Sequence, residues 1–296
     1  MSNAEAAYAV VPYNSWPAFG MANMELDTLH WPLGQPERLK GRQVRDLGPL
    51  DHLIAYPNSE LFYGPWWGIR ANISVMIVEP DILHAKNLKR AYRARKSFYS
   101  VLTKSDALLA KIENGLFFYF GSTFIDNIAA IDPTKTKHMS LITSGKRDFE
   151  GHRLRHRLVD FIQAEGLDVE IMGRGYSPFE HKKDGLQSYR FSVVIENIQE
   201  PHYFTEKLVD AALCRTVPLY WGCPNIDEHF DTSGMILCNS EEALRQQISR
   251  VTKADYESRL AALEENYTRA LDHADYIKRA ALVVKAEVAR RAVQTV

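Results

Sequence analysis

The segment 189-YRFSVVIENIQEPHYFTEKLVDAALCRTVPLYWG-222 decides the fold. Residues 189–197 form a short apolar run typical of a buried strand, and 216–222 form a second one. Between them, 205–215 has the composition of a helix. Parallel strands need a crossover connection, which is usually a helix, so this order indicates a parallel sheet of the doubly wound α/β type.

The same alternation extends upstream. Strands are expected at 138–144 and 168–173, with a helix at 152–166 between them. A less regular series comes before them: strand 72–79, helix 81–94, strand 97–103, helix 105–114 and strand 116–122. The Pro, Thr and Lys content of 126–137 indicates a linker. We therefore predict an α/β domain over 1–136, a second over 137–240, and C-terminal helices over 241–296.

The C-terminal part is predicted to be helical, over 241–252 and 254–291. One helical face would be apolar, through Leu260, Leu263, Tyr267 and Leu271. We expect these helices to pack back on the body of the protein. The alternative is a peripheral membrane contact through the basic residues Lys278, Arg279, Lys285, Arg290 and Arg291.

Composition limits the classes of function. The chain has 296 residues, of which 46% are hydrophobic and 25% charged, as in folded soluble proteins. A formal net charge of −1 gives no reason to expect a nucleic-acid partner. The three cysteines lack metal-ligand spacing and are expected to be packing residues. No secretory signal or membrane span is recognised, so we expect a cytoplasmic protein, with peripheral membrane association as the alternative.

Two predicted helices begin with positively charged residues, which are unfavourable at a helix N-terminus. Lys207 lies in the first turn of 205–215, where the helix dipole disfavours a cation by roughly 0.3–1 kcal/mol. The helix at 152–166 begins with Arg153, Arg155 and Arg157. Both helix starts follow strands of one sheet, at the edge where α/β proteins bind ligands. A diphosphate between Arg155 and Lys207 would explain the pattern, and we expect Arg153 and Arg157 to be ordinary surface cations.

Several motifs are absent from the sequence. There is no GxxxxGK[ST] loop, no GxGxxG fingerprint and no Asp-x-Asp pair. His152 and His156 have the i, i+4 spacing of zinc ligands, but Arg153 replaces the glutamate of a zinc-hydrolase helix and no third ligand is evident. We therefore expect no metal site.

The fixed polar positions around the opening segment resemble a known family. Tyr-Arg-Phe at 189–191, Glu196-Asn197, 203-YFTEK-207 and the Pro-x-x-x-Gly of 218–222 resemble the core of the α-1,3-fucosyltransferases, glycosyltransferase family 10. Upstream, 144-SGKRDFEGHRLRHRLVDFI-162 resembles the serine-led loop and arginine-bearing helix of that family. The resemblance covers roughly 140–240 well and fades over 1–135.

The resemblance implies a GT-B-like α/β fold: two Rossmann-type domains with the cleft between them and C-terminal helices packing back. The part over 1–136 would be the acceptor-side domain, and 137–240 the nucleotide-sugar (donor) domain. The implied activity is that of an inverting glycosyltransferase, which transfers fucose from GDP-fucose to a hydroxyl of a glycan or glycoconjugate. No cofactor would be required.

The resemblance also implies roles for single residues. The residues expected at the donor are Ser144, Lys146, Arg155, Glu196, Asn197, Tyr203, Glu206 and Lys207. Arg155 and Lys207 would contact the diphosphate, and Glu206 the ribose or fucose hydroxyls. The family takes its catalytic base from a glutamate after a buried strand of the N-terminal domain, which here indicates Glu79, with Glu60 and Glu113 as alternatives. A solvent-facing Glu79 without a catalytic role is the structural alternative.

Two other functions remain open at the level of sequence. The same fold can use a different nucleotide-sugar donor, or the chain can be a non-catalytic module that binds glycans or nucleotides. The identity of the acceptor, the linkage formed and the oligomeric state do not follow from these residues.

Overall fold

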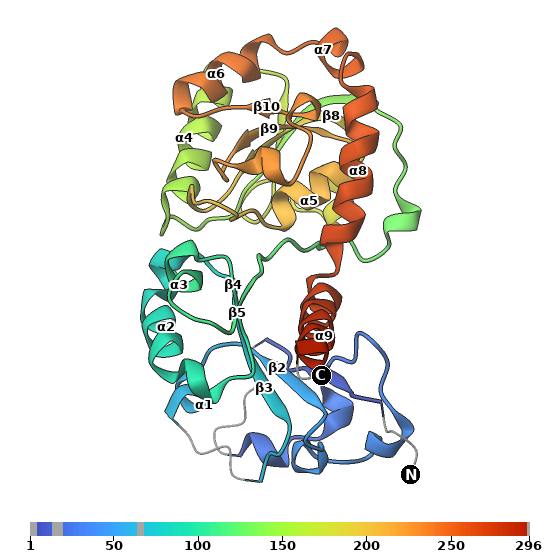
Figure 1. Ribbon diagram of the computed structural model, residues 1–296. Helices are drawn as coiled ribbons and strands as arrows, with labels where there is room; N and C mark the ends of the chain where they lie inside the picture. Colours follow the sequence, from blue (N-terminus) through green and yellow to red (C-terminus); the bar gives the residue numbers. More distant parts are fainter. Residues whose placement is uncertain (1–4, 14–19, 64–67, 295–296) are drawn as a thin grey trace. The chain divides into compact units, whose positions relative to one another are not determined.

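A computed structural model describes residues 5–13, 20–63 and 68–294 (Figure 1). The chain forms two compact units. Unit 1 comprises Met1–Tyr119 and Tyr276–Val296, and unit 2 comprises Phe120–Asp275. Each unit contains its own parallel sheet, as the alternation of strands and helices predicts. The predicted cleft between the domains stays a prediction.

The sheet of unit 1 has five strands in the order β1-β2-β3-β4-β5, and every pair is parallel. The strands are β1 (Tyr8–Val10), β2 (His52–Ala55), β3 (Asn72–Ile77), β4 (Val101–Thr103) and β5 (Gly115–Phe117). The helices are α1 (Ser59–Tyr63), α2 (Asp81–Ala94), α3 (Asp106–Leu109) and α9 (Tyr276–Gln294). Single 3-10 turns are η1 (Met21–Asn23), η2 (Leu26–Thr28), η3 (Glu37–Leu39), η4 (Val44–Asp46) and η5 (Arg95–Ser97).

Unit 1 agrees with the sequence prediction from β3 onward. The helix predicted over 81–94 is α2, with the same bounds. The helix predicted over 105–114 is wrong in its length, because α3 ends at Leu109. Strands β1 and β2 were not predicted, since each is only three or four residues long and fully buried, without an alternating pattern. Helices α2 and α3 lie on one side of the sheet and α9 on the other (Figure 1).

The sheet of unit 2 also has five parallel strands, in the order β10-β9-β8-β6-β7. The strands are β6 (Lys137–Ile142), β7 (Val169–Met172), β8 (Tyr189–Ile195), β9 (Val217–Trp221) and β10 (Ile236–Leu237). The helices are α4 (Glu150–Ala164), α5 (Glu206–Leu213), α6 (Glu241–Arg250), α7 (Lys253–Glu257) and α8 (Leu260–Ala274). The 3-10 turns are η6 (Ile128–Ala130), η7 (Lys182–Gly185), η8 (Ile226–Glu228) and η9 (Thr232–Gly234). Four of the strands, β6 to β9, and helices α4 to α6 match the predicted elements.

The predicted linker, 126–137, is anchored to unit 2. The Nζ of Lys135 donates hydrogen bonds to the carbonyl oxygens of Gln187 and Cys214, at 2.7 and 2.6 Å. Burial lowers the pKa of Lys135 to about 7. Nearer the start of the unit, Thr123 Oγ1 and the Phe124 amide both donate to the buried carboxylate of Asp210. These contacts place the division between units at residue 119, where the sequence indicated 136.

The long C-terminal helix predicted over 254–291 is three helices. The chain leaves helical conformation at Asp275, where φ is −109° and ψ is 77°. The predicted apolar face of α8 is wrong, because Leu260 and Leu271 are 48% and 42% exposed. Its buried face is instead made largely of small and polar side chains: Ala262, Leu263, Asn266, Ala270 and His273. Helix α8 packs on α5 through this face, and small side chains allow the two helices to approach closely.

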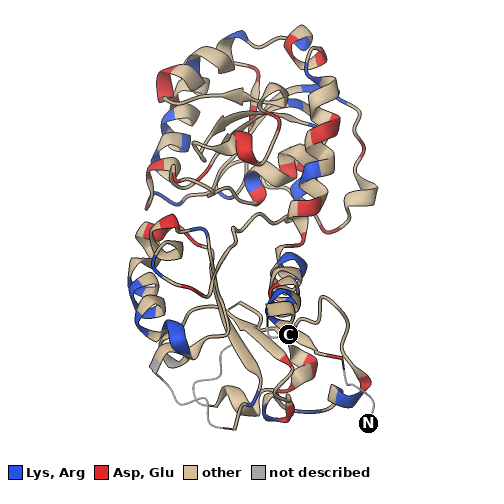
Figure 2. Ribbon diagram, in the orientation of Figure 1, with Lys and Arg blue, Asp and Glu red and all other residues tan. Residues whose placement is uncertain are grey.

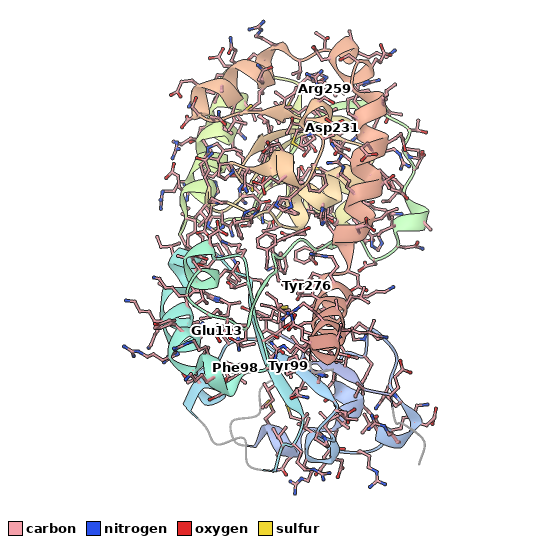
Figure 3. The ribbon with its side chains drawn as sticks, viewed as in Figure 1. Phe98, Tyr99, Glu113, Asp231, Arg259 and Tyr276 are labelled. Atoms are coloured by element: carbon pink, nitrogen blue, oxygen red, sulfur yellow. The ribbon has the colours of Figure 1, made fainter. Side chains whose placement is uncertain are left out.

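Helix α9 returns to unit 1 and packs beside β1. Tyr276, labelled in Figure 3, begins α9. Its hydroxyl forms a hydrogen bond with that of Tyr56. Toward the other end of the helix, Arg291 donates to the Tyr99 carbonyl at 3.0 Å and places its guanidinium carbon 4.2 Å from the centre of that ring. The final helix is therefore part of the N-terminal unit, as the prediction of helices packing back requires.

These contacts involve most of the cations suggested for a membrane contact. Arg279 lies 4.8 Å from the centre of the Tyr119 ring, and Lys285 is 3.8 Å from Glu5. Arg290 and Arg291 both bond to Glu287. No helix in the described part of the chain has the length and hydropathy needed to span a bilayer. A peripheral membrane contact through α9 stays a prediction.

Glu287 is predicted to hold the C-terminal helix in place. Its side chain is only 6% exposed and accepts bonds of 2.6 Å from Arg290 and Arg291. Hydrogen bonds from Arg290 and then Arg291 lower its pKa to about 2. Because the folded-state pKa lies below the unfolded one, this stabilisation is complete above about pH 4.5 and is lost as the pH falls toward 2.

We expect Glu287→Gln to lower the free energy of unfolding by about 1–3 kcal/mol at pH 7, measured by chemical denaturation. The difference from the wild type should shrink as the pH falls from 4.5 toward 2. Glu257→Gln is the control: it removes an exposed ion pair with Lys253 and should cost less than about 0.5 kcal/mol. An equal loss at pH 7 and pH 2 would contradict the role given to Glu287.

Candidate functional site

Two loops meet at the carboxyl edge of the sheet of unit 2. Strand β8 is the middle strand, and Glu196 and Asn197 follow it directly. The loop after β6 leads into α4, and the residues after Asn197 lead into α5. Both helices therefore begin at this edge, where α/β sheets bind ligands. The two basic helix starts singled out in the sequence lie together as predicted.

The start of α4 touches the backbone at the end of β8. The amide of Gly151 donates to the Asn197 carbonyl at 2.9 Å. A Cβ atom on Gly151 would lie 1.8 Å from the carbonyl oxygen of Glu196 and 3.0 Å from that of Asn197. Only glycine permits this approach, so Gly151 sets the distance between α4 and the end of β8.

Arg155 lies one turn further along α4 and is 5% exposed. It donates from Nε to the Gly151 carbonyl and from a terminal nitrogen to Asn197 Oδ1, both at 3.1 Å. Arg153 and Arg157, by contrast, are 49% and 42% exposed and both pair with Glu150 on the surface. The structure thus brings Arg155 to Asn197 and leaves its two neighbours outside the site, as we expected.

The carboxylate of Glu196 is fully buried. It accepts hydrogen bonds from the amide and the hydroxyl of Thr205, at 2.9 and 2.7 Å. Thr205 is the N-cap of α5, and its hydroxyl also accepts a bond from the amide of Lys207. This geometry gives Glu196 a positioning role at the start of α5, and its predicted direct contact with a donor stays a prediction.

Lys207 bonds to its own neighbours. Its Nζ donates to Thr205 Oγ1 at 2.9 Å and to Glu206 Oε1 at 3.1 Å, and it lies 3.6 Å from Glu196 Oε2. The unfavourable position at a helix start is therefore already offset inside the chain by two carboxylates. The lysine side chain as a whole remains 22% exposed.

The charges of this cluster follow from its contacts. Burial raises the pKa of Glu196, although Lys207 opposes the shift. For Glu206, burial also acts to raise the pKa, but the charge and hydrogen bond of Lys207 outweigh it and the pKa is lowered. For Lys207, burial is outweighed by Glu196 and Glu206, and its pKa is raised. Lys207 and Glu206 are thus an ion pair, with a cation fixed at the helix start.

Three other residues predicted at the donor occupy different environments. Ser144 is half-buried after β6, and its Oγ accepts a long bond of 3.5 Å from the amide of Lys146, which is exposed. Tyr203 is 3% exposed, two residues before the N-cap of α5. The direct contacts of Ser144, Lys146, Tyr203 and the other predicted residues with a donor stay predictions.

The histidines of α4 are occupied by local bonds. His156 bonds to the Tyr176 hydroxyl and the Lys146 carbonyl, both at 3.1 Å. His152 accepts a bond from the Phe149 amide. Among the described residues, no group of three or more histidine, cysteine or acidic side chains is arranged to bind a metal.

The predicted base, Glu79, lies in unit 1. It is half-buried and comes two residues after β3, the middle strand of that sheet, at its carboxyl edge. Burial, the Tyr276 hydroxyl and the charge of Glu79 together raise the pKa of Tyr56, which follows β2 at the same edge. The alternative Glu113 precedes β5 and therefore lies at the amino edge. The side chain of Glu60 lies outside the described residues.

Sequence reasoning missed three residues that shape the site of unit 2. Gly151 and Thr205 were part of quoted segments but received no role. Gly222 was noted only for its place in a pattern, and a Cβ there would lie 2.7 Å from Glu196 Cγ. Thr205 had a usable signal, since threonine before an acidic first turn is a typical N-cap. The two glycines had none, because a close approach of backbones is visible only in three dimensions.

Comparisons with known proteins agree with the predicted fold and with the predicted family resemblance. Residues 133–277 match the sequence model described as glycosyltransferase family 10 (fucosyltransferase) C-term. The α-(1,3)-fucosyltransferase FucT of Helicobacter pylori is 36% identical over 62 residues, which are 21% of this chain. The matched stretch spans only 13% of the length of that curated relative. The resemblance predicted for the C-terminal domain is confirmed.

Two solved structures share the fold. A glycosyltransferase from Rickettsia africae matches with a TM-score of 0.55 and 11% identity, over 81% of this chain and 77% of that one. An α1,3-fucosyltransferase crystallised with GDP matches with a TM-score of 0.50 and 15% identity, over 88% and 83% of the two chains. At these identities the likeness concerns the fold, and the predicted GT-B-like class is confirmed.

Gly151→Ala tests the close approach at the centre of the site. Helix propensity alone favours alanine over glycine by about 1 kcal/mol. The clash with the Glu196 carbonyl should nevertheless lower the free energy of unfolding by about 1–3 kcal/mol, measured by chemical denaturation. Gly145→Ala in the loop that precedes α4 meets no atom within 4 Å and is the control. A stabilised Gly151→Ala variant would contradict the contact.

Proposed function

We propose that this chain, whose residues 133–277 match the family 10 C-terminal domain, is a glycosyltransferase that binds a nucleoside diphosphate sugar at the Arg155–Lys207 edge. One observation carries the proposal. Two helices start at the end of β8, and each brings a cation, one bonded to Asn197 and the other to Glu206. Fixed cations beside two helix N-termini suit a diphosphate.

The proposed reaction is a single displacement with inversion at the sugar carbon. A bond forms between the acceptor oxygen and the anomeric carbon as the bond from that carbon to the diphosphate breaks. The leaving group gains negative charge, which Arg155 and Lys207 would stabilise without reorganisation, since both are held by hydrogen bonds beforehand. We propose that these cations suffice and that no metal or cofactor takes part.

GDP-fucose is the proposed donor. Support comes from the fucosyltransferase description of the matched family and from the Helicobacter pylori relative, an α-(1,3)-fucosyltransferase. The α1,3-fucosyltransferase of similar fold was crystallised with GDP. Glu206 is the proposed partner of ribose or sugar hydroxyls, because its pKa is lowered and a carboxylate accepts such bonds.

Glu79 is the proposed general base. The acceptor hydroxyl must release its proton as it attacks, and a carboxylate at a sheet edge can accept it. Glu79 is at the carboxyl edge of β3 and only half-buried, as this role requires. The proposed acceptor is a hydroxyl of a glycan or glycoconjugate.

The donor assignment is tested by thermal shift against GDP, UDP, ADP, CDP and GDP-fucose. We expect GDP and GDP-fucose to stabilise the protein and the other nucleotides to do so weakly. Lys207→Met and Arg155→Met should each weaken GDP binding by about 10–100-fold, the loss expected for a hydrogen bond to a charged group. Stabilisation by UDP alone would indicate a UDP-sugar as the donor in place of GDP-fucose. No response to any nucleotide would overturn the proposal.

Matched variants separate binding from folding. Arg153→Met removes the same side chain from the same helix, but from a surface ion pair, and should leave GDP affinity within about threefold. Lys207→Met leaves Glu196 and Glu206 without their cation and can itself impair folding. Lys207→Arg keeps the charge, so it should fold and still show weakened GDP binding if the position of the ammonium matters.

Glu79→Gln tests the base. We expect sugar transfer to fall by about 10²-fold or more, with GDP affinity unchanged, because the amide cannot accept the proton. Transfer is measured as GDP release that depends on an added glycan. Glu113→Gln is the control and should keep wild-type turnover. If Glu113→Gln abolishes transfer and Glu79→Gln does not, the base is reassigned.

A further inference from the structure

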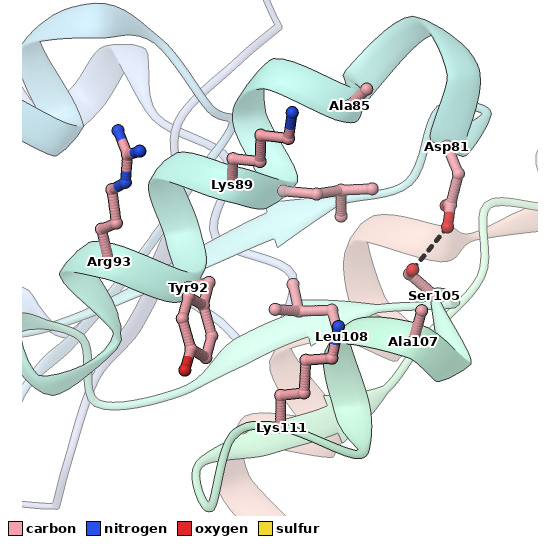
Figure 4. Close-up of a pocket in the computed structure, with 10 residues that line it drawn as sticks. Asp81, Ala85, Lys89, Tyr92, Arg93, Ser105, Ala107, Leu108 and Lys111 are labelled. Atoms are coloured by element: carbon pink, nitrogen blue, oxygen red, sulfur yellow. Dashed lines mark hydrogen bonds between the residues drawn. The ribbon is translucent and has the colours of Figure 1, made fainter.

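Unit 1 contains a groove that the proposed chemistry does not use. It lies between α2 and α3 and has a volume of about 730 Å³, within the range typical of small-molecule sites (Figure 4). Its α2 wall is a single helical stripe, with Ala85, Leu88, Lys89, Tyr92 and Arg93 at spacings of three, four, seven and eight residues. The opposite wall comes from α3 and the turn that follows it.

The groove has the mixed character of a saccharide site. Its floor is apolar, with Leu88 from α2 and the buried Leu108 from α3. Tyr92 is 41% exposed and lies at the side of the hollow (Figure 4). The guanidinium carbon of Arg95 lies 4.6 Å from the centre of this ring, so one face of the ring is covered. The other face offers a flat surface to the carbon face of a sugar ring, and the hydroxyl can form hydrogen bonds.

The rim of the groove is positively charged. Lys89 and Arg93 from α2 and Lys111 from the turn after α3 line the groove, and all three are exposed (Figure 4). In the described part of the chain, none of these three has an ion-pair partner. The one acidic residue of the lining, Asp81, is already bonded to Ser105 and lies 3.4 Å from the buried Lys104. Figure 2 shows lysine and arginine gathered along α2.

The inner end of the groove is close in sequence to the proposed base. Asp81 begins α2 two residues after Glu79, and Ser105 follows β4. Both therefore lie at the carboxyl edge of β3 and β4, where Glu79 lies. A saccharide with its reacting hydroxyl at Glu79 would therefore extend along the edge of the sheet at which the groove begins.

We propose that this groove binds an anionic saccharide, namely the outer part of the acceptor, which carries carboxylate, sulfate or phosphate groups. The assignment of this saccharide as the acceptor rests on the proposed transferase function, but the saccharide site itself does not depend on that function. Lys89, Arg93 and Lys111 bind the anionic groups, and Tyr92 packs on a ring.

A membrane surface would also attract these cations. Ile82 and Leu83 of the same helix are 74% and 45% exposed. However, the apolar residues of the groove lie inside a hollow, which a discrete ligand can enter and a flat bilayer cannot. The lining therefore favours a saccharide, and vesicle binding becomes an outcome that the experiment must distinguish.

The test measures binding to the full chain by calorimetry at low and physiological salt. The probes are trigalacturonate, a heparin-derived tetrasaccharide and mannose 6-phosphate, with maltotriose as the neutral reference. We expect at least one anionic probe to bind and maltotriose to bind at least tenfold more weakly. Lys89→Gln/Lys111→Gln should weaken that probe at least tenfold. The control Lys86→Gln/Lys96→Gln removes two charges from the same region, but outside the groove. It should change the affinity for that probe less than threefold.

Further measurements separate the alternatives. Tyr92→Leu should weaken the bound saccharide but leave binding of inorganic phosphate to the groove unchanged. Binding of none of the anionic probes overturns the proposal. So does binding only to phosphatidylglycerol vesicles, lost equally in both double variants. GDP binding is measured on the same samples: GDP binding without saccharide binding overturns only the groove assignment, whereas saccharide binding without nucleotide binding overturns the acceptor role and the transferase proposal.

Discussion

A fully buried carboxylate at the end of the middle strand of unit 2 determines how the site is built. Glu196 cannot remain in the interior without hydrogen-bond partners, because an uncompensated buried carboxylate costs several kcal/mol. Its partners are the amide and hydroxyl of Thr205, and these fix where α5 begins. Once α5 begins there, the Lys207 ammonium group is directed back to the same carboxylate. One buried acid thus places a strand end, a helix start and a cation.

The fold was predictable where its elements are long and periodic. The β8–α5–β9 segment and helix α2 agree with the patterns because each buries a continuous run or a full helical stripe. Strands β1 and β2 are continuously buried but only three and four residues long, and they pair within a sheet assembled from distant parts of the chain. The face of α8 misled the prediction for a different reason. Its neighbour α5 requires close approach, so Ala262 and Ala270 are buried while Leu260 and Leu271 remain exposed, against the usual ranking by hydrophobicity.

The sequence predicted which residues lie together at the candidate site better than it predicted the interactions that hold them there. The two basic helix starts did indicate a common edge, and Arg155 was correctly separated from Arg153. The reason given for Lys207 changes, however. A lysine at a helix N-terminus is unfavourable in isolation, but here Glu196 and Glu206 balance it before any ligand arrives. The position of Lys207 therefore indicates a rigidly held cation. The evidence for a bound anion is instead the partial exposure of the Lys207 side chain and the presence of Arg155 at the same edge. No sequence pattern reveals Gly151, because its role depends on a carbonyl 45 residues away in the chain.

Although its net charge is near zero, this protein has two kinds of positively charged site. Those at the carboxyl edge of unit 2 are held among carboxylates and largely shielded from solvent, so dissolved ions screen their interactions only weakly. Those of the α2–α3 groove are exposed and lie close to like charges, so they interact through water and are screened within about 8–10 Å at physiological salt. The first kind suits a group whose charge changes during a reaction, because a fixed cation stabilises that change without rearranging. The second suits a ligand that must be captured and released, because its affinity is the sum of several weak contacts. The fixed cations of unit 2 thus suit the proposed reaction, and the exposed cations of the α2–α3 groove suit reversible ligand binding, within one nearly neutral chain.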